Sequence, residues 1–195
     1  MAGKQKNEFV QLGGILCAIT LVVALALGAV NAVTVDKIAQ INQQKIEDSL
    51  EAVMPGAESE AIEVAEGTTV TTETKNATPV EILSAYKMTK DGADAGYCVE
   101  VGPTGFGGTV DTMVGIDVDG NVTGISVISA AQETPGLGAN STKPEFQEQF
   151  AGLVGAEVAV EKDGGSIVAL TGATITSRCV SEGVAAAAKF AAQQG

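Results

Sequence analysis

The sequence contains no histidine and no tryptophan, and its 195 residues include only two tyrosines and five phenylalanines. Without histidine, the chain cannot form a histidine-based catalytic triad or proton shuttle, and most zinc sites are excluded. With so few aromatic residues, an aromatic sandwich around a ligand would have to come from very few positions. These absences indicate a chain without bond-making chemistry of its own, and we predict no catalytic residue in it.

Basic residues are also scarce. The chain has 11 Lys and Arg against 24 Asp and Glu, which gives a net charge of −13. Binding to nucleic acid depends on Lys and Arg side chains that neutralise phosphates. We therefore expect no nucleic-acid partner.

Cysteine is limited to Cys17, Cys98 and Cys179, with no C-x-x-C spacing. Cys17 lies in an apolar run, so only Cys98 and Cys179 could pair within one domain. The sequence thus predicts neither a disulfide framework nor an iron–sulfur cluster held by this chain alone. We interpret the three residues as small, buried and apolar.

One long hydrophobic run is present, because no charged residue stands between Glu8 and Asp36. About 20 apolar residues cross the hydrocarbon core of a bilayer, so residues 9–35 are long enough even when tilted. The alternative is a cleaved signal peptide, with small side chains at residues 28–32 and a mature chain that begins near Val33. The run is longer than a usual signal core, which favours a retained transmembrane helix.

The charges on either side of this run predict its orientation. Residues 1–8 carry Lys4, Lys6 and the amino terminus, whereas the chain from Asp36 onward holds 23 acidic and nine basic residues. The positive-inside tendency places residues 1–8 in the cytoplasm. We expect a single-pass protein of the plasma (inner) membrane, with residues 57–195 forming an extracytoplasmic domain.

Residues 36–56 are predicted to form an amphipathic stalk helix that ends at Pro55-Gly56. Residues 57–79 show little periodicity, and both short strands and a surface excursion remain open. Strands are predicted at 81–90, 97–101, 109–118 and 122–129. Asp119-Gly120 is the expected hairpin turn between the last two.

A second hairpin is predicted to pair residues 158–160 with 167–170 around the turn at 162–165. A short helix is expected at 143–151, and an alanine-rich helix at 177–192. Strands that alternate with a few helices predict an α+β domain built on one antiparallel sheet.

Three loops invite functional interpretation. Residues 105–108, Gly-Phe-Gly-Gly, match neither the dinucleotide fingerprint nor a P-loop, and taken alone they favour a bulge or turn over a ligand contact. Residues 133–138, Glu-Thr-Pro-Gly-Leu-Gly, are either an ordinary exposed loop or a ligand-facing loop with a carboxylate and free backbone donors. Residues 117–121 lack the glycine and glutamate that a calcium loop requires, so we predict a hairpin turn there and no metal site.

The segment 171–177, Thr-Gly-Ala-Thr-Ile-Thr-Ser, follows a strand-like run and opens the alanine-rich helix. Hydroxyl groups there lie beside the unpaired N–H groups of a helix N-terminus, which is a favourable place for a phosphate. The alternative is that these side chains only cap the helix.

These elements together resemble a known family. The chain resembles the G subunit of the Rnf ion-translocating ferredoxin:NAD oxidoreductase complex, and also the C subunit of the Na⁺-pumping NADH:quinone reductase, which shares the flavin domain. The resemblance covers nearly the whole chain, and the compact length favours the Rnf protein. It rests on the N-terminal anchor, residues 53–57, residues 105–108, the Asp119-Gly120 hairpin, residues 133–138, residues 146–150 and residues 171–177.

The resemblance implies FMN joined covalently, through a phosphodiester, to Thr174 by a flavin transferase that uses FAD and magnesium during maturation. It implies cofactor contacts from two loops: Glu133, Thr134, Pro135, Gly136, Leu137 and Gly138 in one, and Thr171, Gly172, Ala173, Ile175 and Thr176 in the other. One position departs from the family pattern. The acceptor motif usually carries an acidic residue three positions before its first threonine or serine, and Val168 stands there in this chain.

The leading hypothesis is a membrane-anchored flavoprotein subunit that relays electrons between the other subunits of a membrane redox complex that pumps Na⁺ or H⁺. The flavin would supply the redox chemistry, and the protein its position and electrostatics. The alternatives are the C subunit of a Na⁺-pumping quinone reductase, a non-redox anchored β-rich binding domain, and a self-standing extracytoplasmic flavin reductase.

Overall fold

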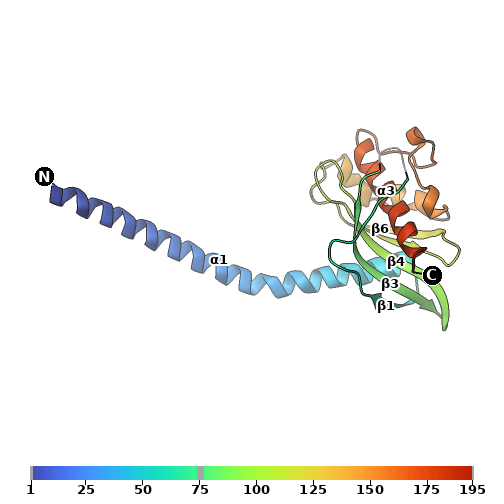
Figure 1. The fold of residues 1–195 in the computed structure, drawn as a ribbon, viewed down its shortest axis with the longest axis horizontal. Helices are drawn as coiled ribbons and strands as arrows, with labels where there is room; N and C mark the ends of the chain where they lie inside the picture. Colours follow the sequence, from blue (N-terminus) through green and yellow to red (C-terminus); the bar gives the residue numbers. More distant parts are fainter. Residues whose placement is uncertain (1, 74–76, 195) are drawn as a thin grey trace. The chain divides into compact units, whose positions relative to one another are not determined.

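The structure is a computed structural model that describes residues 2–73 and 77–194, without the side-chain surroundings of residues 2–9 and 156. The chain divides into two compact units, Met1–Gln44 and Lys45–Gly195. Helix α1 (Ala2–Val53) forms the first unit and contributes its last turns to the second (Figure 1).

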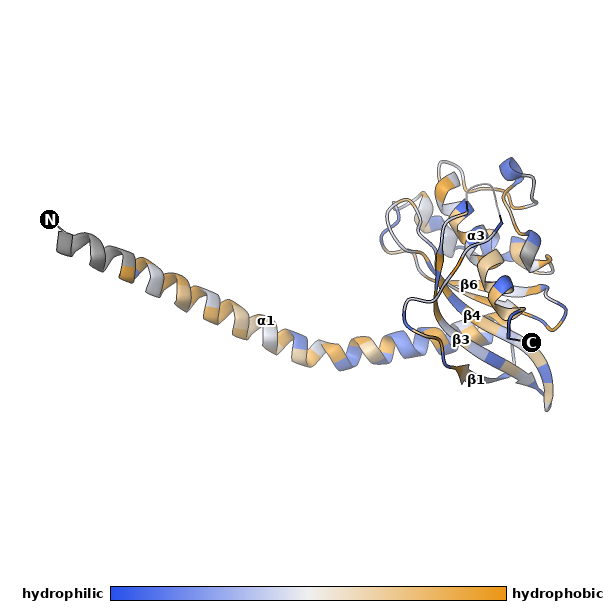
Figure 2. Cartoon of the chain, viewed as in Figure 1, coloured by the Kyte–Doolittle hydropathy of each residue, from blue (hydrophilic) through white to orange (hydrophobic). Residues whose placement is uncertain are grey.

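The apolar run of α1 is the longest in the chain. Within the described residues, α1 is the one helix that is long and apolar enough to cross a membrane, a criterion that a signal sequence also meets. Its most apolar window lies within Val10–Val53, with a mean hydropathy of 2.5, and none of that window is buried. Figure 2 shows mostly apolar residues along the visible side of α1 from Val10 onward, with hydrophilic residues toward its C-terminal end. The helix ends at Val53, and a turn at Pro55-Gly56 follows, where Gly56 has a φ of 69°.

The second unit is built on one antiparallel sheet, which confirms the predicted α+β class. The order is β1-β3-β4-β5-β6, and β2 also pairs with β3. The strands are β1 (Glu58–Ile62), β2 (Thr69–Val70), β3 (Val80–Lys90), β4 (Ala93–Gly102), β5 (Asp111–Ile116) and β6 (Val122–Ser129). Strands β3 to β6 overlap the four predicted strands. Strands β1 and β2 show that residues 57–79 contain short strands, which was one of the two alternatives left open by the sequence.

The predicted Asp119-Gly120 hairpin joins β5 to β6. The Asp117 carboxylate accepts hydrogen bonds from the backbone N–H groups of Asp119 and Asn121 at 2.9 and 2.8 Å, and Gly120 has a φ of 84°. Asp117 therefore fastens a turn, as an Asx side chain commonly does, rather than presenting a calcium ligand.

The second predicted hairpin is wrong. Residues 158–160 and 167–170 form no antiparallel pair, and a single parallel bridge joins Val160 to Ile167. Between them the chain makes a 3-10 turn, η4 (Glu161–Asp163), that ends at Gly164 with a φ of 96°. The alternating apolar residues arise because Val158, Val160 and Ile167 are buried in the core.

Each face of the sheet is covered by a helix. Along β4, Cys98 packs in one apolar cluster and Val99 in the other, because successive strand residues point to opposite faces. The Cys98 side holds the last turns of α1, including Leu50 and Val53. There the hydroxyl of Thr123 donates to the Val53 carbonyl at 2.7 Å.

The opposite face holds the main core and the C-terminal helix α3 (Thr174–Ala191), which lies against the sheet in Figure 1. Several alanines of α3 are buried in that core. The predicted helix at 143–151 is present as α2 (Pro144–Gln147) followed by the 3-10 turn η2 (Glu148–Phe150). The rings of Phe146 and Phe150 are both buried and meet edge to face, with centroids 5.3 Å apart. Further 3-10 turns, η1 (Gly138–Thr142) and η3 (Gly155–Glu157), complete the connections.

Candidate functional site

Three loops that are far apart in the sequence meet where α3 begins. They are residues 105–108, residues 133–138 and residues 171–176, and they enclose a cavity of about 330 Å³. The lining residues are Phe106, Glu133, Thr134, Leu137, Gly138, Gly172, Ala173, Thr174, Ile175 and Thr176. A cavity of this size lies at the lower end of the range of small-molecule sites.

Helix α3 begins at Thr174, three residues before the predicted start. The sequence did not predict a helical first turn at residues 174–176 because β-branched Thr and Ile have low helix propensity. Tertiary contacts hold this turn instead. The N-cap position is Ala173, and no side chain caps the helix. The interpretation of the hydroxyl cluster as a helix cap is therefore wrong, because the N-cap residue is an alanine without a side-chain acceptor.

The other hydroxyl groups of the cluster have different partners. The Thr176 hydroxyl donates to Glu133 Oε2 at 2.7 Å. The Ser177 hydroxyl donates to the Ala173 carbonyl at 3.0 Å and accepts from the Leu170 N–H at 2.9 Å. Both side chains are buried, whereas Thr174 is half-buried and lines the cavity.

Glu133 connects the three loops. Its side chain is only 4% exposed, and its second oxygen, Oε1, accepts a hydrogen bond from the Gly107 N–H at 3.0 Å. One carboxylate thus joins the glycine-rich loop, its own loop and the first turn of α3. A buried carboxylate needs such partners, because an unpaired charge away from water is costly.

Glycine is required where these loops touch. A Cβ on Gly138 would lie 2.0 Å from Glu133 Oε2, and a Cβ on Gly107 would lie 1.9 Å from the Gln132 carbonyl oxygen. The loop at 105–108 is therefore a turn, as the sequence favoured. Because its glycines have no side chain, the backbone at residues 132–133 can approach it closely. Phe106, between these glycines, lines the cavity.

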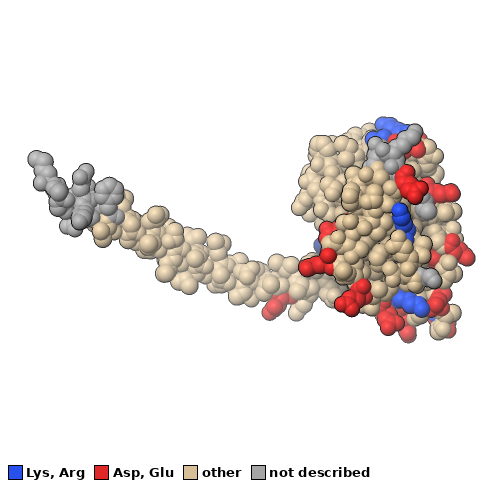
Figure 3. All heavy atoms as spheres, in the orientation of Figure 1, with Lys and Arg blue, Asp and Glu red and all other residues tan. Residues whose placement is uncertain are grey.

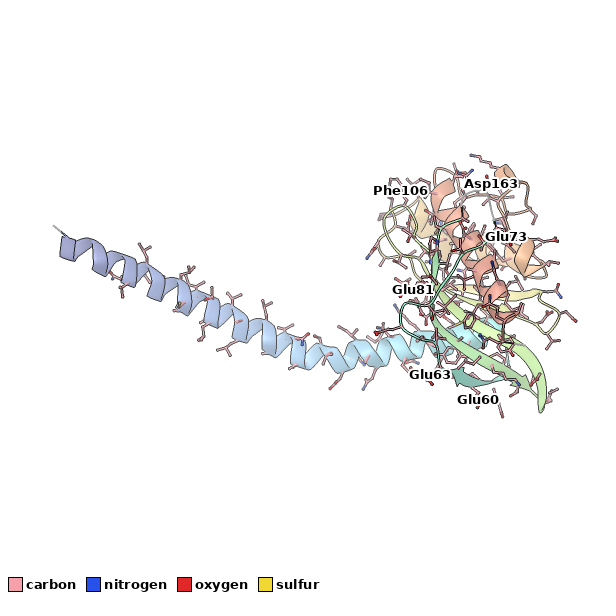
Figure 4. All side chains as sticks on the ribbon, in the orientation of Figure 1. Glu60, Glu63, Glu73, Glu81, Phe106 and Asp163 are labelled. Carbon is pink, nitrogen blue, oxygen red and sulfur yellow. The ribbon has the colours of Figure 1, made fainter. Side chains whose placement is uncertain are left out.

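Apolar side chains surround the cavity mouth. Phe106, Leu137 and Ile175 are 70%, 42% and 51% exposed, which is unusual for three large apolar residues close together. Phe106 and Asp163 lie at the same end of the domain, opposite to Glu60 (Figure 4).

One basic side chain reaches the half-buried threonine. Lys162 Nζ lies 3.5 Å from Thr174 Oγ1 and donates to it. The neighbouring Asp163 binds Arg178 through two contacts, at 2.6 Å to Nε and 2.9 Å to the terminal nitrogen. Acidic residues outnumber basic ones in the chain by 24 to 11, and Figure 3 shows groups of both kinds on the visible face of the domain.

Two of the three cysteines are buried as predicted and all three are free, whereas Cys17 is exposed on α1. Burial raises the pKa of the Cys98 thiol to about 12. Burial also raises the pKa of the Cys179 thiol to about 12, with a further contribution from the carboxylates of Glu133 and Glu182. Both thiols are therefore protonated and unreactive at neutral pH.

The sequence-predicted residues come together largely as a group. Nine of them line the cavity, whereas Pro135, Gly136 and Thr171 are exposed beside it. Their contact with a cofactor stays a prediction. The sequence interpretation missed two residues of the site, Phe106 and Lys162. The glycine-rich loop was only weak evidence that Phe106 contacts a ligand, and no pattern in the sequence pointed to Lys162.

Comparison with known proteins now gives these residues a context. Residues 105–189 match a protein family described as an FMN-binding domain. This span contains all three loops of the site, so FMN is the cofactor indicated for this domain.

The chain is also similar to named G subunits of ion-translocating oxidoreductase complexes. It is 36% identical over 182 residues, covering 89% of this chain and 87% of the relative, to the G subunit of the Na⁺-translocating ferredoxin:NAD⁺ oxidoreductase complex of Acetobacterium woodii. It is 33% identical over 181 residues, 89% and 84% of the two chains, to the G subunit of the ion-translocating oxidoreductase complex of Shewanella baltica. Over 102 residues, 51% and 55% of the two chains, it is 39% identical to the G subunit of a proton-translocating ferredoxin:NAD⁺ oxidoreductase complex of Clostridium ljungdahlii. The chain therefore belongs to the family of G subunits of ion-translocating oxidoreductase complexes, with the FMN-binding domain of that family at residues 105–189.

Proposed function

We propose that this chain is a membrane-anchored electron-relay subunit that carries FMN as a phosphodiester on Thr174. The observation that carries the proposal is the position of the Thr174 side chain. It is the first residue of α3 and lines the cavity, with its hydroxyl beside the Lys162 ammonium group. The chemistry that FMN supplies when bound is the acceptance and donation of electrons, one or two at a time.

The residues of the cavity fit a phosphate joined to a flat, largely apolar ring. A phosphodiester keeps one negative charge, and the uncapped N-terminus of an 18-residue helix stabilises it by about 0.3–1 kcal/mol. Phe106, Leu137 and Ile175 offer apolar surface to the ring and exclude water from it. Glu133 and Gly138 hold the loops in place around the cavity.

Covalent attachment suits the proposed location. We propose that residues 9–35 span the plasma (inner) membrane, with residues 1–8 in the cytoplasm, residues 36–56 as a stalk and residues 57–195 outside. A helix of 27 residues is about 40 Å long and the hydrocarbon core is about 30 Å thick, so the span accommodates tilt. Outside the cytoplasm a dissociable cofactor would be lost by dilution, and an ester prevents that loss.

The partners follow from the family. The relatives are named as subunits of ion-translocating oxidoreductase complexes, so we propose that other subunits of such a complex donate and accept the electrons. A flavin transferase would act during maturation. One relative is named for Na⁺ and another for protons. The named relatives therefore include complexes that translocate either ion.

The decisive experiment is intact and peptide mass spectrometry of the full-length chain, made with and without a flavin transferase. We expect a mass increase of FMN less one water, localised to Thr174, and fluorescence that survives denaturation. Thr174→Ala should abolish both. Thr142→Ala is the matched control because Thr142 is exposed, does not line the cavity and lies outside the acceptor motif. Flavin that stays attached to the Thr174→Ala variant would refute the assignment.

The proposed anchor has its own test. The mature protein isolated from membranes should keep its N-terminal peptide, and protease added from outside should remove the domain but leave residues 1–8 protected. A mature chain that begins near Val33 would instead identify a cleaved signal peptide.

A further inference from the structure

Lys162 is an exposed side chain whose ammonium group lies beside the proposed acceptor threonine. It is the middle residue of η4 (Glu161–Asp163), and its Nζ contacts Thr174 Oγ1 at 3.5 Å. Among the described residues, the ion pairs involve Lys87 and Arg178, and Lys162 takes part in neither. Its ammonium group is therefore directed to the hydroxyl rather than to a carboxylate.

The position of η4 is fixed from both sides. Buried Val160 and Ile167 flank it, and the Glu161 N–H donates to the Ile167 carbonyl at 2.9 Å. On the other side, Asp163 binds Arg178, which lies four residues after Thr174 and so on the same face of α3. This arrangement neutralises the Arg178 charge and leaves the Lys162 charge available at the helix N-terminus.

We propose that Lys162 is the positioning residue that holds the phosphate at Thr174, first while the flavin is attached and then in the finished phosphodiester. The inference rests on the proposed function and deepens it by assigning a cation to the attachment site. It also gives a role to a positive side chain at this site. The chain carries a net charge of −13, which repels an incoming phosphate, and Lys162 opposes that repulsion locally.

The attachment step shows where the charge acts. The Thr174 oxygen forms a bond to the flavin-side phosphorus of FAD, the bond from that phosphorus to the oxygen linking the two phosphates breaks, AMP departs, and the hydroxyl proton is released. No electrons are transferred. The flavin-side phosphate stays negatively charged while further negative charge develops on the departing AMP, and one negative charge remains on the ester. The Lys162 ammonium group, 3.5 Å from Thr174 Oγ1, would stabilise the charge on the phosphate that this oxygen joins.

The test uses the full-length chain, a flavin transferase and FAD with Mg²⁺. The rate of flavin attachment is measured as a function of acceptor concentration for the wild type, Lys162→Gln and Lys162→Arg. Lys189→Gln is the matched control, because it removes the same charge at a position about 22 Å along α3 from Thr174. Lys189 donates to the Thr71 carbonyl and does not line the cavity. The ³¹P resonance of the finished ester is recorded for each loaded protein.

We expect attachment to Lys162→Gln to be about five-fold slower, as fits the loss of one partly solvated charge contact of about 1 kcal/mol. Arg should restore the rate to within about two-fold, and added salt should shrink the difference. The ³¹P resonance should shift in the Gln variant alone, while the midpoint of thermal unfolding stays unchanged.

Two results would overturn the inference. One is a Lys162→Gln protein that is loaded as fast as the wild type and shows the same ³¹P resonance. The other is equal slowing in the Lys189→Gln control, which would show only an effect of net charge. A wild-type chain that is never loaded by an active transferase would instead refute the proposed function, and the inference with it.

Discussion

Replacement of Glu133 tests whether one buried carboxylate holds the site together. Its two oxygens accept from the Thr176 hydroxyl at 2.7 Å and from the Gly107 N–H at 3.0 Å, and the side chain is 4% exposed. Hydrogen bonds to a charged group contribute about 1.5–3 kcal/mol each, and loss of the carboxylate also removes the cost of burying a charge. We therefore expect Glu133→Ala to lower the free energy of unfolding by about 2–4 kcal/mol.

Glutamine provides an internal comparison. In Glu133→Gln the amide oxygen still accepts from the Gly107 N–H, and the amide nitrogen donates to the Thr176 hydroxyl, which rotates to accept. Because both contacts persist without the charge, we expect a loss of only about 1 kcal/mol. Glu66 is exposed in a turn that does not line the cavity, so Glu66→Ala should change stability by less than about 0.5 kcal/mol.

The assay is urea unfolding of the full-length chain in detergent, followed by tyrosine fluorescence. The chain has no tryptophan and both tyrosines, Tyr86 and Tyr97, lie in the sheet, so the signal reports on the domain and not on the apolar helix. With a urea dependence of about 2 kcal/mol per molar, the alanine variant should unfold at a urea concentration about 1–2 M lower. An alanine variant no less stable than Glu66→Ala, or a glutamine variant as unstable as alanine, would refute the reasoning.

Three further outcomes are expected. Burial raises the pKa of the Glu100 carboxyl, although the hydrogen bond from Ser84 opposes the shift. The folded state therefore binds this proton more tightly than the unfolded state, and the free energy of unfolding falls as pH rises through the raised pKa. Glu100→Gln should therefore be more stable than the wild type at pH 7, with the difference lost near pH 4 in urea titrations. The thiols of Cys98 and Cys179, each with a pKa of about 12, should resist a thiol reagent at pH 8 in the folded domain and react after denaturation. Because Cys17 is exposed, the labelled positions are identified by peptide mass spectrometry, and fast labelling of Cys98 or Cys179 in the native protein would contradict their burial. Gly138→Ala should lower both stability and the yield of attached flavin, because its Cβ would lie 2.0 Å from a buried carboxylate oxygen, and wild-type behaviour would show that the loops tolerate a wider separation.

Local patterns in the sequence predicted much of the fold. Alternating apolar residues located β3 to β6, and the Asp119-Gly120 pair located the turn between β5 and β6, because strand period and turn chemistry are properties of neighbouring residues. The same rule failed at residues 158–170. There an alternating pattern reflects burial in the core and not pairing, and nothing local distinguishes the two cases.

The site divides in a similar way. The hydroxyl cluster and the loop at 133–138 were recognised from their composition and order along the chain, and they do border one cavity. The start of α3 and the lack of a side-chain cap were not predicted, because contacts with Glu133 and Ala173, rather than helix propensity, hold the first turn. Lys162 gave no signal at all, since a single lysine in a loop has no pattern.

The sequence by itself determined the long uncharged run, the antiparallel α+β class, the family and the two loops of the site. Each of these depends on composition or on residues that lie close together in the chain. Only the tertiary structure decided that Gly107, Glu133 and Thr176 share hydrogen bonds, and that Lys162 reaches Thr174. These contacts join residues between 12 and 43 positions apart. Their geometry depends on the path of the whole chain through the sheet and its covering helix, and no local pattern of residues encodes that path.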